Sequence, residues 1–296
     1  MNVPFRFVCF VALLALPTTA ACGGSGVTIG EFDASSPSDG GTPQSTDGAT
    51  NPDGAASGPK VSIYVRATAA TFPHQDGLAS LQPKDERLWI KSLAFDYANG
   101  PSNLKVFELT DAKETPINDK DETLVAEVPI STLTNGTAIK AHVAVTTVAY
   151  RVPTKLHWNN MTVDGEILGH QAMSNGAVLG GSPRNSGYYT VDFLFGGNKV
   201  AGTSGESAPL PTGPVGGGFE LSLDQGVAYY SFPLSLPISN SVKSDLKMYM
   251  TLNVDHNFRW VDSKKADYVA GAWDTEPPTF EEVVRFGANS FALSLE

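Results

Sequence analysis

Alternation of apolar and polar residues with a period of two is the sequence feature that most constrains the fold of this chain. The clearest run covers residues 246–254, and similar runs cover residues 61–67, 139–145, 189–195 and 228–236. Because successive side chains of a strand point to opposite faces of a sheet, each run predicts a strand with one dry and one wet face. The sequence therefore predicts an all-β domain, an antiparallel β-sandwich or barrel-like fold.

Signals for helices are few. Thr279 and Glu282 have the spacing of a capping box just after two prolines, which predicts a short helix over residues 279–286. A second short helix could occupy residues 263–273. A parallel β-α-β architecture would need long amphipathic helices between its strands, and none is evident. The all-β domain should therefore contain one or two short helices.

Turn signals separate the apolar runs. Asn135-Gly136 stands between Leu133 and Ile139 and predicts a hairpin turn. Residues 196–218 are rich in Gly, Pro and Ser and are interpreted as one long loop. Because loops longer than about 12–15 residues are unusual in compact domains, this stretch predicts either a functional flap or a boundary between two β-subdomains.

The N-terminus has the order of a secretory signal peptide. Arg6 precedes an apolar run over residues 7–16, and small residues then lead to Ala21. A basic start, a short apolar stretch and small residues at a cleavage point are typical of such signals. The apolar run is too short to cross a membrane as a helix, which needs about 20 residues. Residues 1–21 are therefore predicted to be removed on export.

The residues at the cleavage point, Thr19-Ala20-Ala21-Cys22, resemble the lipobox of bacterial lipoproteins. They depart from it at Thr19, where leucine is preferred. The resemblance implies cleavage before Cys22, acylation of Cys22 with fatty acids such as palmitate, and a lipid anchor in the cell envelope. Gly23 in place of aspartate implies, again by resemblance, the outer membrane, at its periplasmic or its surface face. Ordinary cleavage after Ala21, which would release a secreted protein, is the alternative.

A polar segment follows the cleavage point. Gly, Ser, Thr, Asp and Pro dominate residues 23–58, where Val27, Ile29 and Phe32 are the only large apolar residues. Such a segment cannot bury enough apolar surface to offset the entropy of ordering. Residues 22–58 are therefore predicted to be a lipidated cysteine with a disordered tether, and residues 59–296 the all-β domain.

Charge and cysteine content exclude several classes of protein. The formal net charge is -11, from 31 acidic and 20 basic residues, and no basic block is present. Nucleic-acid binders need clustered Lys and Arg, so a nucleic-acid partner is excluded, and membrane contact should come from the acyl chains on Cys22. With Cys9 in the signal peptide and Cys22 at the anchor, the folded domain has no disulfide, cysteine zinc site or thiol nucleophile.

Neither a metal site nor a catalytic motif is evident. The five histidines lack ligand spacing. Residues 118–122 are interpreted as an acidic hairpin tip, with a calcium site as the less favoured alternative. The sequence contains no G-x-S-x-G motif. We therefore expect no metal and no cofactor, and catalysis has no support, although distant acids and histidines could still converge in space.

Aromatic residues near polar ones give the one positive signal for a binding site. Trp158, Trp260 and Trp273 are the candidates, with Phe258 beside them in the sequence. β-Sandwich modules commonly hold sugars between exposed tryptophan rings and neighbouring amides. The alternative is that these rings belong to the core, because tryptophan buries a large area in a sandwich. A pocket beside Trp260 and under residues 196–218 is where a ligand would be sought.

Together these features predict a lipid-anchored envelope protein with a non-catalytic binding or structural role. Its partner would be a glycan or another envelope protein. A carbohydrate-binding module and an exported hydrolase with a dispersed site are the alternatives.

Overall fold

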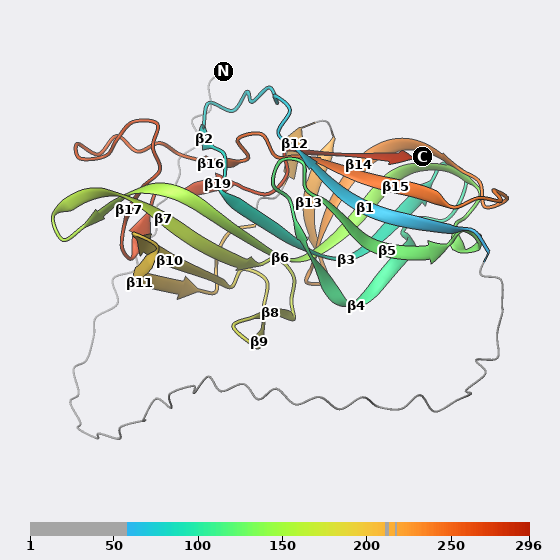
Figure 1. The fold of residues 1–296 in the computed structure, drawn as a ribbon, viewed down its shortest axis with the longest axis horizontal. Coiled ribbons are helices and arrows are strands. Elements are labelled where there is room, and N and C mark those ends of the chain that lie inside the picture. The colour runs from blue at the N-terminus through green and yellow to red at the C-terminus, as the bar shows by residue number, and fades with distance from the viewer. Residues whose placement is uncertain (1–57, 211–212, 217) are drawn as a thin grey trace, which may run out of the picture. The chain divides into compact units, whose positions relative to one another are not determined.

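A computed structural model describes residues 58–210, 213–216 and 218–296 of the chain (Figure 1). The predicted signal peptide, Cys22 and nearly all of the tether lie outside these residues. Within them the fold is all-β, as the alternating runs predicted, and the one helical segment described is the 3₁₀ helix η1 (Ile130–Thr132). Across the described part of the chain, no helix has the length and apolar character needed to cross a membrane.

Four sheets make up the fold. The four-stranded sheet has the order β20-β15-β1-β5, and its strands are β1 (Lys60–Thr68), β5 (Glu122–Pro129), β15 (Leu246–Asn253) and β20 (Ser290–Leu295). Within it, β1 and β15 run parallel although about 185 residues separate them in the chain, as the hydrogen bond from Lys60 to Asp245 illustrates. A three-stranded sheet has the order β19-β16-β2, with β2 (Ala79–Leu81), β16 (Phe258–Trp260) and β19 (Val283–Arg285), and β8 (Ala177–Leu179) pairs with β9 (Ser182–Arg184).

The largest sheet has eleven strands. Its main path runs β11-β10-β7-β6-β14-β13-β12, while β3, β4, β17 and β18 branch from it. The bounds are β3 (Asp85–Tyr97), β4 (Leu104–Pro116), β6 (Gly136–Trp158), β7 (Met161–Ala172), β10 (Tyr189–Phe195), β11 (Asn198–Gly205), β12 (Gly213–Gly216), β13 (Phe219–Asp224), β14 (Val227–Ile238), β17 (Asp274–Glu276) and β18 (Thr279–Phe280).

Strand β6 organises this sheet because it is 23 residues long and changes neighbours along its length. On one edge, residues 136–145 pair with β14 and residues 147–158 pair with β7. On the other edge, β3 pairs with residues 138–151 and β17 pairs with residues 155–156. Figure 1 shows β6 running from the strands around β14 to those around β7 and β10.

Two apolar cores lie along β6. The first core is formed by the inward faces of β1, β15 and the part of the sheet around β14, and it includes Val61, Ile63, Met248 and Met250, which the period-two pattern predicted. The second core lies at the other end of β6. Its buried members are Tyr150, Val152, Leu156, Ile167, Val191, Phe193, Phe258, Trp260 and Trp273.

Both predicted helices are wrong. Residues 279–286 form β18 and β19, and residues 263–273 form turns without a helix. The reason lies in Glu281, the neighbour of the predicted capping residue. Its buried carboxylate accepts hydrogen bonds from the backbone N–H groups of Ser263 and Asp274 and so holds both segments in an irregular arrangement.

Two loop predictions also need correction. Residues 196–218 are not one long loop, because β11 and β12 occupy much of the stretch. The stretch passes from β10, beside the second core, to β13, beside the first, and the described residues on both sides of it belong to one compact unit. Asn135-Gly136 is not a hairpin turn, because β5 before it and β6 after it belong to different sheets.

Two residues of the predicted dry faces, Ile139 and Phe195, are exposed. Ile139 is exposed, whereas Ala141, Val143 and Val145 are buried as predicted. The pairing of β14 with β6 shifts register between Pro233 and Leu236, opposite this part of β6. Such a β-bulge reverses the side on which the flanking residues point.

Candidate ligand-binding pocket

The three tryptophans of the predicted binding site do not form one site. Trp260 and Trp273 are fully buried in the second core together with Phe258, so their ring faces contact protein rather than solvent. Phe258 and Trp273 pack edge to face, with ring centroids 4.7 Å apart. Trp158 is only partly buried against the same core. For Trp260 and Trp273 the structure therefore shows the core alternative, and Trp158 alone keeps an accessible surface.

A pocket lies where a ligand would be sought, beside the second core and under part of residues 196–218. Its volume is about 210 Å³. We call it the aromatic pocket. Its lining residues are Tyr150, Gln171, Tyr189, Val191, Ser207, Ala208, Pro209, Phe280, Glu282, Val283 and Phe286. Adjacent strands β6, β7 and β10 supply its floor, residues 207–209 supply one wall and residues 280–286 supply the other.

The floor has room for two tyrosine rings because a glycine stands opposite each of them. Gly169 pairs with Tyr150, and a Cβ atom at position 169 would lie 2.3 Å from the Tyr150 ring. Gly205 pairs with Tyr189, and a Cβ atom there would lie 2.6 Å from the Tyr189 ring. Since real Cβ atoms do not approach other atoms so closely, any side chain at either glycine would displace a tyrosine.

Hydrogen bonds tie the 207–209 wall to the floor. The buried Gln171 side chain donates through Nε2 to the carbonyl of Pro209, at 3.3 Å. The N–H of Ala208 donates to the carbonyl of Gly187, at 2.8 Å. This wall is therefore bonded in place at two points.

The 280–286 wall is held at both ends by buried carboxyl groups. At its start, Glu281 accepts hydrogen bonds from the N–H groups of Ser263, at 2.5 Å, and Asp274, at 2.8 Å. Just beyond its end, Oε1 of Glu86 accepts from the N–H of Gly287, at 2.8 Å. Burial raises the pKa of Glu281, although the two backbone hydrogen bonds oppose this and the nearby carboxyl of Asp274 adds to it.

Glu86 itself lies in the interior between the two cores. Its second oxygen accepts a hydrogen bond from Nδ2 of Asn257, at 2.5 Å. Burial, with a smaller contribution from the neighbouring Asp85, raises the pKa of Glu86 to about 8, and the hydrogen bonds from Asn257 and Gly287 oppose the rise. Near neutral pH this carboxyl is therefore mainly protonated.

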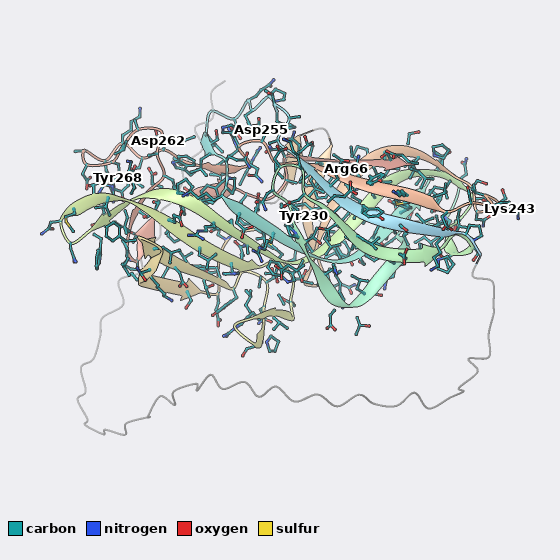
Figure 2. The ribbon with its side chains drawn as sticks, viewed as in Figure 1. Arg66, Tyr230, Lys243, Asp255, Asp262 and Tyr268 are labelled. Carbon is teal, nitrogen blue, oxygen red and sulfur yellow. The ribbon has the colours of Figure 1, made fainter. Side chains whose placement is uncertain are left out.

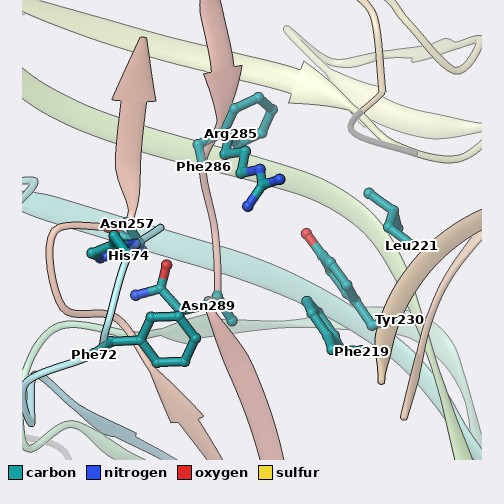
Figure 3. Close-up of a pocket in the computed structure, with 10 residues that line it drawn as sticks. Phe72, His74, Phe219, Leu221, Tyr230, Asn257, Arg285, Phe286 and Asn289 are labelled. Atoms are coloured by element: carbon teal, nitrogen blue, oxygen red, sulfur yellow. The ribbon is translucent and has the colours of Figure 1, made fainter. Parts of the chain in front are cut away.

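Asn257, which donates to this carboxyl, also lines a smaller cavity of about 20 Å³ (Figure 3). Figure 3 shows the Tyr230 hydroxyl pointing into it on the side of Arg285, with Asn257 on the opposite side. The buried Tyr230 hydroxyl and Asn257 Oδ1 have no hydrogen-bond partner among the described residues. Phe286 lines both this cavity and the aromatic pocket, so it separates the two. Figure 2 places Tyr230 in the middle of the strands, between Tyr268 and Lys243.

A serine, a histidine and an aspartate, the residue types of a hydrolase triad, lie together on the polar face of the large sheet. The Ser231 hydroxyl lies 2.8 Å from His142 Nδ1, and His142 Nε2 lies 3.1 Å from Asp96 Oδ2. These three side chains come from neighbouring strands β14, β6 and β3. Because β14 is paired on both sides here, its N–H groups near Ser231 are used in ladder hydrogen bonds. An oxyanion needs free donors of that kind, so the arrangement fits a polar row on a sheet better than a catalytic triad.

Trp158 borders an open hollow of about 410 Å³ at the end of the β6–β7 hairpin. Asn159 and Asn160 form the turn of that hairpin, and both have positive φ angles. Together with Asp267 and Glu276 they give the hollow a mainly polar lining.

The acidic stretch 118–122 lies in the turn that joins β4 to β5, which belong to different sheets. Its carboxylates hold the turn. Asp119 accepts from the N–H of Ala69, at 2.8 Å, and Asp121 accepts from the N–H of Asn118, also at 2.8 Å. Among the residues that the structure describes, no group of three or more His, Cys, Asp or Glu side chains is placed to hold a metal ion.

Comparison with protein-family models, with curated proteins and with solved structures finds no match to this chain.

Of the two sequence markers for a pocket, residues 207–209 of the stretch 196–218 line the aromatic pocket and Trp260 does not. Tyr150, Gln171, Tyr189 and Phe286 carried no local signal, because they come together only through strand pairing. Gly169 and Gly205 would have been informative only with the register of β6, β7, β10 and β11 already known.

Proposed function

We propose that this protein is a lipid-anchored, non-catalytic binding protein of the cell envelope, and that the aromatic pocket receives its ligand. The observation that carries the proposal is the pocket itself, with two tyrosines seated against glycines and both walls bonded in place. Ligand sites are typically concave and mainly apolar, with a few placed polar groups. The signal-like N-terminus and the lipobox-like Cys22 support the envelope location.

The volume of the pocket limits the size of the ligand. An apolar cavity of about 150 Å³ is enough to bind benzene. At about 210 Å³ the aromatic pocket fits a molecule, or the end of a molecule, with about the size of one substituted six-membered ring. Gln171 and the tyrosine hydroxyls would orient a polar group on it.

A pair of glycine substitutions on β11 tests the proposal. In Gly205→Ala the new methyl group would push the Tyr189 ring out of its position, so the affinity for pocket ligands should fall by about tenfold or more. In Gly202→Ala the new methyl group would meet mainly the flexible end of Lys199, which can move away, so affinity should not change.

The measurement is ligand-detected NMR with a mixture of single-ring and short-chain fragments, first on the wild-type protein and then on the two variants. The proposal requires hits that Gly205→Ala loses and Gly202→Ala keeps. Absence of any hit on the folded wild-type protein, or equal binding by both variants, would contradict it.

The anchor is tested separately. Cys22→Ser should leave the exported protein in the soluble fraction, because no thiol remains to be acylated. Mass spectrometry of the membrane fraction should show acyl chains on Cys22 of the wild-type protein. Retention of the serine variant in the membrane fraction would refute lipid anchoring.

Glycan binding at the Trp158 hollow is a second candidate function. The observation that favours it is an accessible tryptophan beside Asn159, Asn160 and two carboxylates. Trp158→Ala should then abolish the retardation of the protein in a gel that contains the bound polysaccharide. Unchanged migration of the wild-type protein across a panel of envelope polysaccharides would argue against this role.

A further inference from the structure

We propose that the aromatic pocket selects a methylated ammonium ion, such as the trimethylammonium group of choline. This inference rests on the proposed function of the same pocket and names the chemical class of its ligand. It draws on the charge of the lining, the number and arrangement of its rings, and the mainly apolar surface of the lining.

The charge of the lining favours a cation. Glu282 is the one carboxylate among the described lining residues, and no Lys, Arg or His lies among them. Tyr150 does not compete as an anion, because burial and, to a lesser extent, the neighbouring Tyr189 raise the pKa of Tyr150. An anionic ligand would meet Glu282 without any balancing base, whereas a cation would be attracted to it.

The rings favour a cation that lies against aromatic faces. Tyr150, Tyr189, Phe280 and Phe286 line the pocket and come from three separate parts of the chain. The rings of Tyr150 and Phe286 have centroids 5.6 Å apart and planes inclined by 45°, so they form adjoining walls rather than one flat stack. The face of an aromatic ring attracts a cation within about 6 Å of its centroid, and several rings together form the cages that recognise quaternary ammonium groups.

These rings are held apart by packing behind them. Tyr150 also packs on Phe258, with centroids 5.2 Å apart, and Phe280 packs edge to face on the buried Trp273, at 6.0 Å. Tyr189 is seated against Gly205. Because Tyr150, Tyr189 and Phe280 have support outside the pocket, ordering these three rings should cost little entropy on binding.

The mainly apolar surface of the lining favours a methylated ammonium over a primary one. A primary ammonium carries three N–H donors that lose water on binding and need partners. The lining offers the exposed Glu282 carboxylate, the hydroxyls of Ser207 and the tyrosines, and the carboxamide oxygen of Gln171, set among mainly apolar surface. Methyl groups need no acceptors and gain from contact with that surface.

Isothermal titration calorimetry with choline chloride and with 3,3-dimethylbutan-1-ol tests the inference. The second compound has the shape of choline but no charge. We expect choline to bind and the neutral compound to bind at least tenfold more weakly. Equal binding of the two would overturn the choice of a cation while leaving the pocket as a binding site. Failure of choline to bind would also overturn it, and the fragment screen above then decides the proposed function independently.

Substitutions test whether the preference for a cation comes from the carboxylate of the pocket. Glu282→Gln should weaken choline binding about two- to fivefold and leave the neutral compound unaffected, as expected for loss of one exposed charge. Glu127→Gln is the matched control, because it removes an exposed carboxylate on β5 that does not line the pocket. Tyr189→Leu should weaken choline binding about tenfold. Equal effects of Glu282→Gln and Glu127→Gln would refute a specific role for Glu282 and, with it, the charge argument.

The same cation could reach the pocket as a free molecule or as a lipid headgroup. Vesicles of phosphatidylcholine distinguish the two sources. If the headgroup enters the pocket, the vesicles should compete with choline, and vesicles of phosphatidylglycerol should not. If only free choline binds, neither kind of vesicle should compete. Equal competition by both vesicle types would contradict recognition of the ammonium group.

Discussion

The buried carboxyl of Glu86 should make the folded state less stable as the pH rises from about 4.5 to about 8. Glu86 lies on β3 with only 1% of its surface exposed, and no basic group is among the causes of its pKa shift. Its pKa is about 8 in the folded protein, against 4.5 for an ordinary glutamate. Below pH 4.5 both the folded and the unfolded chain carry this proton, so the contribution to stability is fully present.

Between those two values the unfolded chain releases the proton and the folded protein retains it. Folding then becomes less favourable by about 1.4 kcal/mol for each pH unit. The window between pH 4.5 and pH 8 therefore corresponds to a loss of at most about 5 kcal/mol, a large fraction of the 5–15 kcal/mol typical of whole domains. Above pH 8 the group is ionised in both states and its contribution no longer changes.

Glu86→Gln keeps the shape of the side chain and removes the titration. Its carbonyl oxygen can still accept the hydrogen bond from Gly287. Its amide takes the place of the oxygen that faces Asn257 Nδ2, so the Asn257 carboxamide must turn and present its unpartnered Oδ1 to accept from it, at the cost of the hydrogen bond from Nδ2 to the carbonyl of Gly287; this cost does not depend on pH. At pH 8.5 the variant should be more stable than the wild-type protein by several kcal/mol. At pH 5 the difference should be much smaller.

The measurement is urea unfolding of both proteins at pH 5, 6, 7, 8 and 8.5, followed by tryptophan fluorescence. The difference between the two proteins at each pH removes the effects of all other carboxyl groups. A difference that stays constant across this range would refute the buried, uncharged state of Glu86. Greater stability of the wild-type protein at pH 8.5 would refute it as well.

Two further predictions concern polar groups outside the aromatic pocket. The Arg259 guanidinium is almost fully buried and paired with Asp76. Asp76→Ala leaves this buried charge unpaired, so it should destabilise the protein by about 3 kcal/mol in urea unfolding. A loss of stability below about 0.5 kcal/mol would show that the pair is solvated. Ser231 should not react with a fluorophosphonate probe, because its strand offers no free N–H donors for an oxyanion; labelling that Ser231→Ala abolishes would revive the hydrolase alternative.

The fold class could be predicted because a strand with one buried and one exposed face alternates apolar and polar residues along its sequence. The runs at residues 61–67 and 246–254 became β1 and β15, and the residues expected on the dry face are buried except Leu246, which is half-buried. Tyr249, expected on the wet face, is buried as well. Their parallel pairing could not be predicted, because nothing local in either run specifies a partner so distant in the chain.

The wrong predictions of a helix over residues 279–286 and of one long loop over residues 196–218 have the same physical origin. The capping-box spacing is a weak local preference, and the tertiary hydrogen bonds of Glu281 outweigh it. Strand β11 contains Gly202, Ser204 and Gly205, which have low strand propensity. It forms because its backbone pairs with the free edge of β10. Tertiary context decided both elements.

The length of β6 has a consequence for how the domain comes apart. One continuous strand contributes Val143 and Val145 to the first core and Val152 and Leu156 to the second. If either core unfolds, apolar residues of β6 lose their packing partners, and β6 also supports the other core. Heating should therefore give a single calorimetric peak, and proteolytic cleavage within residues 206–210 should not yield two fragments that each stay folded alone.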